Sequence, residues 1–154
     1  MGTAANVLVG SAAIEIDSTP IGYTVDGATL TISSEFADIK VEENIGTIIR
    51  KLTDQTVQVT FSMAEGTLEN LAKAIPGSSL LGTILTLGGS DLQEVEIVLT
   101  GEKPGGGNRV ITLANCNPVG EVGVPYKKGE ISVVPVTFSA LVDDSGNFGT
   151  IDDS

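Results

Sequence analysis

The segment from Val57 to Met63 alternates strictly between apolar and polar side chains, and it limits the possible folds more than any other part of the chain. A period of two is typical of a β-strand with one buried face. The expected buried face consists of Val57, Val59, Phe61 and Met63, and the opposite face of Gln58, Thr60 and Ser62. The chain must therefore form a sheet with at least one face against an apolar core.

A short helix is predicted directly after this strand, over about residues 67–75. Thr67 can act as its N-cap by accepting a free backbone N–H of the first turn. The apolar residues that follow have the i, i+3, i+4, i+7 spacing of a helix that lies on a core; they are Leu68, Leu71, Ala72 and Ile75. Pro76 and Gly77 end the helix, because proline cannot continue it and glycine accepts the exit geometry.

The remaining apolar runs are short and separated by turn residues, including many of the 19 glycines, as in a turn-rich β fold. The expected strands are 7–16, 21–25, 28–33, 36–42, 80–87, 92–99, 109–113 and 131–142. The predicted fold class is mainly β: a β-sandwich or rolled β-barrel with one short flanking α-helix. We expect residues 1–142 to form a single β domain with a projecting hairpin at 42–54, followed by a polar C-terminal tail at 143–154.

Three local patterns refine this prediction. Asp26–Gly27 favours a two-residue hairpin turn between the strands on either side of it. Residues 115–128 contain prolines and glycines and are expected to be irregular. Pro135 lacks a backbone N–H, so the strand 131–142 is expected at an edge of the sheet or at a bulge.

The composition disfavours several classes of function. The 154 residues carry 8 Lys and Arg against 20 Asp and Glu, a net charge of -12, which disfavours attraction to nucleic acid or to an anionic membrane. Histidine is absent and Cys116 is the only cysteine, so the usual proton shuttle is missing and no disulfide can form within the chain. No apolar run approaches the length of a membrane span. We expect no enzymatic activity, no cofactor and no membrane insertion.

The segment Glu42–Asp54 interrupts the regular strand pattern. Charged and polar residues lead into an apolar stretch that contains Ile45, Ile48 and Ile49 and is followed by two basic residues. One interpretation is an ordinary strand with an irregular turn. The alternative is an excursion that buries its isoleucines against a neighbouring subunit, because exposed apolar patches usually have a partner.

A second open alternative comes from the C-terminal region. Asp143, Ser145 and Asn147 have the 1, 3, 5 spacing of a calcium loop, but Phe148 stands where that loop needs glycine and Ser154 where it needs a bidentate glutamate. This pattern leaves open a calcium- or carbohydrate-binding β-sandwich module of an adhesin. Aromatic residues, on which sugars stack, make up only 4% of the chain.

The order of these features resembles the phage tail tube protein family, the major tail proteins of long-tailed phages, which is similar in fold to the tube protein of the type VI secretion system. A Gly/Ala-rich first strand, an Asp-Gly dipeptide, a charged excursion and an alternating strand that runs into one short helix occur in that order. The closing segment, residues 129–141, reads GEISVVPVTFSAL. Family members often end on a strand of this pattern, with a Pro or Leu followed by apolar, Thr, Phe, small, Ala and Leu positions.

This resemblance implies a structural subunit of a bacteriophage tail tube that assembles into stacked, hexameric rings and forms the conduit for DNA ejection. The implied partners are further copies of the chain, the tape measure and terminator proteins of the tail, and DNA that passes without specific binding. The implied location is the virion tail, after synthesis in the host cytoplasm. The ring-stacking contacts would lie on Glu42, Glu43, Ile45, Ile48, Ile49, Arg50 and Lys51.

Overall fold

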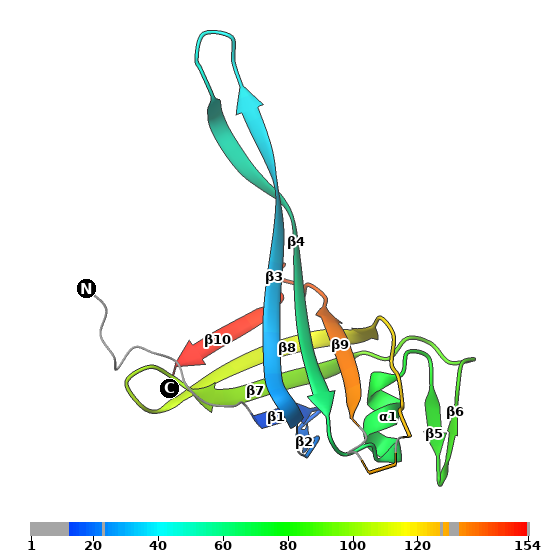
Figure 1. The fold of residues 1–154 in the computed structure, drawn as a ribbon. Coiled ribbons are helices and arrows are strands. Elements are labelled where there is room, and N and C mark those ends of the chain that lie inside the picture. The colour runs from blue at the N-terminus through cyan, green and yellow to red at the C-terminus, as the bar shows by residue number, and fades with distance from the viewer. Residues whose placement is uncertain (1–12, 23, 127, 130–132, 154) are drawn as a thin grey trace.

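The computed structural model describes residues 13–22, 24–126, 128–129 and 133–153, and it is mainly β with one short helix (Figure 1). One large antiparallel sheet has the strand order β2-β1-β7-β8-β9-β4-β3, and β10 also pairs with β8. The strands are β1 (Ala13–Ile16), β2 (Thr19–Pro20), β3 (Thr24–Lys40), β4 (Thr47–Met63), β7 (Val95–Glu102), β8 (Asn108–Val119), β9 (Val134–Ala140) and β10 (Gly149–Asp153). The predicted fold class is confirmed at this level.

Strand β8 is the point at which the sheet rolls over. One edge of β8 pairs with β7 along most of its length. Its other edge is divided, since residues 109–113 pair with β10 and residues 116–119 pair with β9. As a result β3, β4 and β9 run steeply across the direction of β7 and β8 (Figure 1). The sheet covers a single core from both sides, as in a sandwich, while remaining continuous at the roll.

The core consists of aliphatic side chains with one stacked aromatic pair. Phe61 of β4 and Phe138 of β9 stack with their ring centroids 5.9 Å apart. The alternation from Val57 to Met63 is confirmed, because its four apolar residues are all buried. Strand β9 alternates in the same way, and its buried residues are Val134, Val136, Phe138 and Ala140.

The predicted helix is present as α1 (Leu68–Ala74), with Thr67 as N-cap accepting the backbone N–H of Asn70. Its buried face is rotated from the predicted one: Asn70 and Ala74 are buried, while Leu68 is exposed. The Asn70 side-chain amide donates to the carbonyl oxygens of Ile21, at 3.0 Å, and Glu65, at 2.9 Å. A polar residue thus takes the inward position because two backbone carbonyls need a donor there.

Several predicted turns and strands were wrong. Asp26–Gly27 is not a hairpin turn, because β3 continues through it with a register shift between Val25 and Ala28. Gly27 has a φ of 71°, a conformation that both a bulge and a turn accept. The single strand expected at 80–87 is instead the small hairpin of β5 (Ser79–Leu81) and β6 (Ile84–Thr86). Gly82, with a φ of 63°, opens its two-residue loop.

The C-terminal half also departs from the prediction. The first part of 115–128 is regular, because β8 extends to Val119. Strand β9 is an interior strand, so the edge position inferred from Pro135 was wrong. Pro135 is tolerated because the pairing with β8 ends at Val119 and Thr137, which leaves only the β4 side occupied there. The expected polar tail contains the paired strand β10.

Parts of three expected strands lie outside the described residues. These parts are 7–12 of the first strand, residue 23 of the strand expected at 21–25 and 131–132 of the last one, and Ser154 of the calcium pattern also lies outside.

Candidate self-assembly surface

The β3–β4 hairpin projects far beyond the body of the molecule (Figure 1). Every residue from Thr31 to Asp54 is exposed except Thr47, which is half-buried. We refer to residues 35–54 as the arm. It is longer than the projection expected at 42–54, because its first strand, Glu35–Lys40, pairs with Thr47–Asp54. Core contacts end near Val57, so the arm is a two-stranded ribbon without support from the rest of the sheet.

Cross-strand pairs fix the geometry of the arm. Phe36 lies opposite Leu52, and Ile39 lies opposite Ile49, on the other face of the ribbon. Register shifts occur between Glu35 and Phe36 and between Ile39 and Lys40. Such bulges increase the local twist, and the ribbon in Figure 1 is visibly twisted at this level. Both faces of the arm therefore present apolar side chains.

One ion pair holds the two strands of the arm in register. The Arg50 guanidinium Nε donates to Asp38 Oδ1 at 2.7 Å. This hydrogen bond lowers the pKa of the Asp38 carboxyl below its usual value. Because both side chains are exposed, we assign the pair a role in register rather than in stability.

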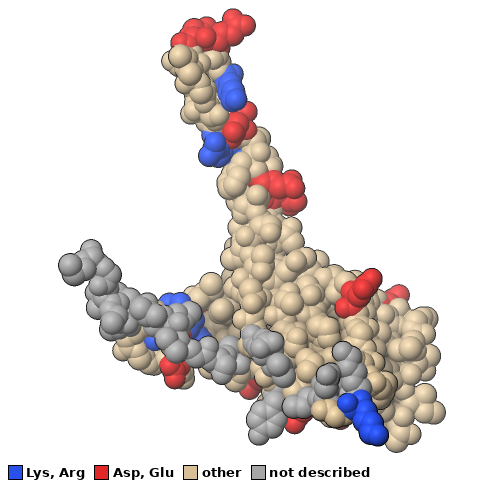
Figure 2. Space-filling model, viewed as in Figure 1, with Lys and Arg blue, Asp and Glu red and all other residues tan. Residues whose placement is uncertain are grey.

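The arm carries an unusual amount of exposed apolar surface. Eight large apolar side chains along it and at its root are at least one third exposed; they are Ile32, Phe36, Ile39, Val41, Ile45, Ile48, Ile49 and Leu52. Ile45, at the tip, is 108% exposed. The acidic group at the tip in Figure 2 belongs to this turn, which contains Glu42 and Glu43.

The structure brings all seven sequence-predicted contact residues together on the arm. Their neighbours Phe36, Ile39 and Leu52 were not predicted as contacts. The sequence predicts a strand at 36–42 and holds no signal that this stretch lies beyond the core. Only the pairing with the second strand of the arm shows it.

The outer edge of β3 is a second exposed feature. Among the described residues, β3 pairs only with β4. A strand of 17 residues thus presents one edge of backbone N–H and C=O groups without a neighbouring strand. Natural proteins usually shorten, charge or cover such an edge, because it invites pairing with another chain.

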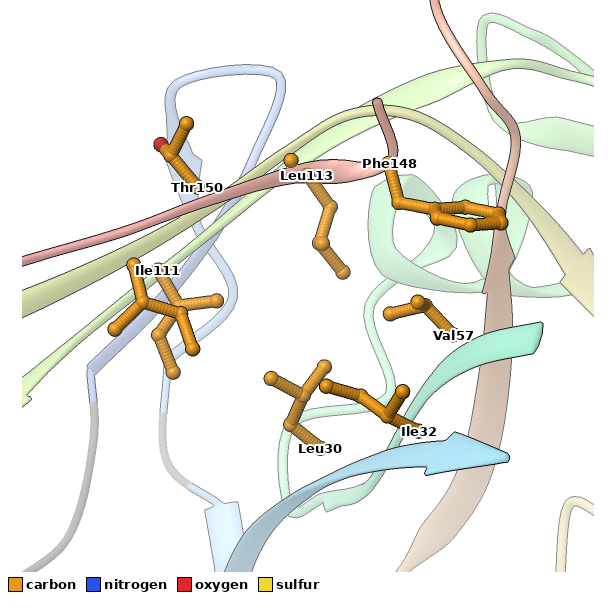
Figure 3. Close-up of a pocket in the computed structure, with 9 residues that line it drawn as sticks. Leu30, Ile32, Val57, Ile111, Leu113, Phe148 and Thr150 are labelled. Carbon is orange, nitrogen blue, oxygen red and sulfur yellow. The ribbon is translucent and has the colours of Figure 1, made fainter. Parts of the chain in front are cut away.

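An apolar groove lies at the root of the arm, and we call it the root groove. Figure 3 shows side chains from β3 and β4 facing side chains from β8, β10 and the residue before β10 across it. Its volume is about 110 Å³. The lining residues are Leu30, Ile32, Val57, Ile111, Leu113, Phe148, Gly149, Thr150 and Ile151. Ile32 and Ile151 are each more than half exposed, so the groove is open to solvent.

Two groups outside the arm bear on reactivity and metal binding: the Cys116 thiol and the loop that begins at Asp143. Burial raises the pKa of the Cys116 thiol to about 12, which leaves the thiol neutral and unreactive at ordinary pH. Across the described ranges, no three His, Cys, Asp or Glu residues cluster as metal ligands. In the loop considered for calcium, Asp143 Oδ1 accepts the backbone N–H groups of Ser145 and Asn147.

Comparisons with known proteins do not assign the chain to a family. No model of a known protein family matches it, and a search of curated proteins finds no relative. Within the residues that the structure describes, no helix has the length and apolar character needed to cross a membrane.

Proposed function

We propose that this chain is a structural subunit of a bacteriophage tail tube, which polymerises into stacked, hexameric rings that enclose a conduit for DNA ejection. Its main partners are further copies of itself, and the tape measure and terminator proteins of the tail complete the assembly. The protein then resides in the virion tail after synthesis in the host cytoplasm. The sequence pattern of the closing strand and the mainly β fold with one helix support this proposal.

The observation that carries the proposal is the arm. A two-stranded ribbon in water is marginally stable by itself, and this one exposes apolar side chains on both faces and at its tip. Contiguous exposed apolar surface on a soluble protein usually marks a protein–protein contact. The arm is therefore well suited to contact a neighbouring subunit, in particular one of the next ring.

The open edges of the sheet support assembly around a ring. The sheet ends at β3 on one side and at β2, with two residues, on the other. Contacts repeated around an axis close into a ring, and contacts that do not close generate a filament. In the proposed assembly, neighbours cover the outer edge of β3, which removes a site of uncontrolled strand addition.

The charge of the chain is compatible with DNA passing without being held. Tight binding to DNA requires Lys and Arg side chains that displace its counterions. The net charge of -12 disfavours such binding to DNA. An acidic lumen would repel phosphate groups over a distance of about 8–10 Å at moderate salt.

Electron microscopy of Ile48→Asp tests the proposal. Ile48 is a little under half exposed, so a charge there leaves the monomer folded but places an unpaired carboxylate in the arm contact. We expect the wild type to form rings or tubes when concentrated, and Ile48→Asp to remain monomeric with an unchanged unfolding midpoint. The matched control is Ile48→Val, which keeps a β-branched apolar side chain and should assemble.

Two results would count against the proposal. One is a wild-type protein that stays monomeric at every concentration. The other is an Ile48→Asp variant that yields as many tubes as the wild type. A monomer that gains thermal stability with calcium or sugars would instead favour the adhesin module.

A further inference from the structure

The tip of the arm carries an apolar side chain that the arm itself cannot cover. Ile45 is 108% exposed and lies between the acidic turn residues and Gly46, whose φ is 101°. Its distance from the body follows from strand geometry: the segment from Ile32 to Lys40 alone spans about 27 Å. Ile45 therefore cannot reach the root of its own arm, and any apolar site that covers it belongs to another molecule.

The root groove has the size and chemistry to receive such a side chain. Its volume of about 110 Å³ is several times the roughly 10–15 Å³ that one water molecule needs, so it has room for a branched side chain such as isoleucine. Of the side chains that line it, only Thr150 is polar (Figure 3). A cavity of this kind gains little from holding water and gains from an apolar occupant.

Glycine at position 149 lets β10 lie close against β8 in one wall of the groove. Gly149 lies opposite Leu113 in the antiparallel pairing of β10 with β8. A Cβ at Gly149 would come within 2.1 Å of the Thr112 carbonyl oxygen and 2.9 Å of a Leu113 methyl group. Any other residue there would move β10 away from β8, so glycine keeps the two strands that form this wall together.

Two basic side chains lie near one end of the groove, together with several acidic ones. Arg109 lies two residues before Ile111 on β8, on the same face of the strand as the groove lining. It is paired with Asp153 at 2.6 Å, and Lys103 adds a second positive charge near this carboxylate. The tip of the arm carries Glu42 and Glu43. An arm that enters the groove would bring its two carboxylates toward these two cations, beside which Glu102 and Asp152 are also exposed.

We propose that Ile45 at the arm tip of one copy seats in the root groove of a second copy, with Glu42 and Glu43 directed toward Arg109 and Lys103. This inference rests on the proposed function, since it names the receptor of the arm in the assembled tube. The contact is heterologous: each molecule uses its tip on one neighbour and its groove on another. Such a contact propagates from copy to copy rather than ending at a dimer.

Disulfide trapping between two single variants tests this contact. Ile45→Cys and Ile151→Cys are each exposed in the isolated chain, and Ile151 lines the groove. Mixed, co-assembled and mildly oxidised, they should form a covalent dimer, because a disulfide requires Cα atoms within about 7 Å. The native Cys116 is buried and does not compete. Ile45→Cys mixed with Leu81→Cys is the matched control, since Leu81 is an exposed apolar residue of β5 outside the groove.

The outcomes separate the two proposals. Assembly with a covalent dimer only in the Ile45→Cys and Ile151→Cys mixture supports the groove as receptor. Assembly, verified by microscopy, without that dimer overturns the receptor assignment but leaves the tube subunit intact, and a dimer with Leu81→Cys would place the receptor on the β5–β6 hairpin. Failure of the unmodified chain to assemble removes the proposed function and this contact together.

As a second measurement, Ile151→Lys should abolish assembly, and combining it with Ile45→Glu in the same chain should restore it. Restoration requires the two positions to face each other across the contact. A double variant that assembles no better than Ile151→Lys would contradict the pairing.

Discussion

At the scale of single residues, the polar groups of the interior have specific backbone partners. Asn70 is the one polar residue found buried among the described residues, and its amide serves two carbonyl oxygens from different segments, those of Ile21 and Glu65. It thereby attaches the start of α1 to the loop before the helix and to the segment that follows β2. A second amide, that of Gln93, donates to the carbonyl oxygens of Ala72 and Ile75 at the end of the same helix.

We therefore expect Asn70→Ala to lower the free energy of unfolding by about 1–3 kcal/mol, because one buried and one partly buried carbonyl oxygen lose their donor. Denaturant unfolding of the monomer measures this change. The control is Asn44→Ala at the exposed tip of the arm, which should change the free energy by less than about 0.5 kcal/mol. Equal effects of the two substitutions would refute the structural role of Asn70.

At the scale of elements, the stability of the body does not depend on the arm. Ser34 and Gln55 lie directly opposite each other at the boundary, and their side chains are hydrogen-bonded at 3.4 Å. Buried residues begin two positions later, at Val57. The core should therefore form without the arm.

Replacing residues 35–54 by Asn-Gly should leave a folded body, because a two-residue turn of this type joins two directly paired residues. We expect the unfolding midpoint of the shortened chain to lie within a few degrees of that of the wild type, by calorimetry, while polymers disappear in electron micrographs. A shortened chain that is unfolded would show that the arm contributes to the core after all.

The elements differ in how well the sequence predicts them. The faces of β4 and β9 and the N-cap of α1 follow from local patterns, because alternation and capping depend on neighbouring residues. The course of β3 through Asp26–Gly27 and the interior position of Pro135 do not, since both depend on which strands lie alongside. The same distinction applies to the candidate site. The contact residues within 42–51 were predicted from one segment, whereas the root groove combines side chains from β3, β4, β8 and β10 and has no linear signal.

At the scale of the whole molecule, an acidic chain must bring like-charged copies together. Each copy carries a net charge of -12, and the proposed contacts are largely apolar. Repulsion between copies acts over several ångströms and is screened by salt, whereas burial of apolar surface is not weakened by moderate salt.

We therefore expect salt to promote polymerisation. Raising the salt concentration from about 0.01 M to about 0.15 M shortens the screening length from roughly 30 Å to roughly 8 Å. The protein concentration at which light scattering first rises should fall over this range. Ile48→Asp, measured in parallel, should show no such rise. Assembly that weakens with salt would indicate a contact dominated by ion pairs.

The end of the core at Val57 has a consequence for how such a protein can diverge. The arm residues are not needed for the body to fold, but the root groove shares Val57 and Leu113 with the core. A lineage can therefore vary the arm without unfolding the body, while the receptor of the arm tip is constrained by the core.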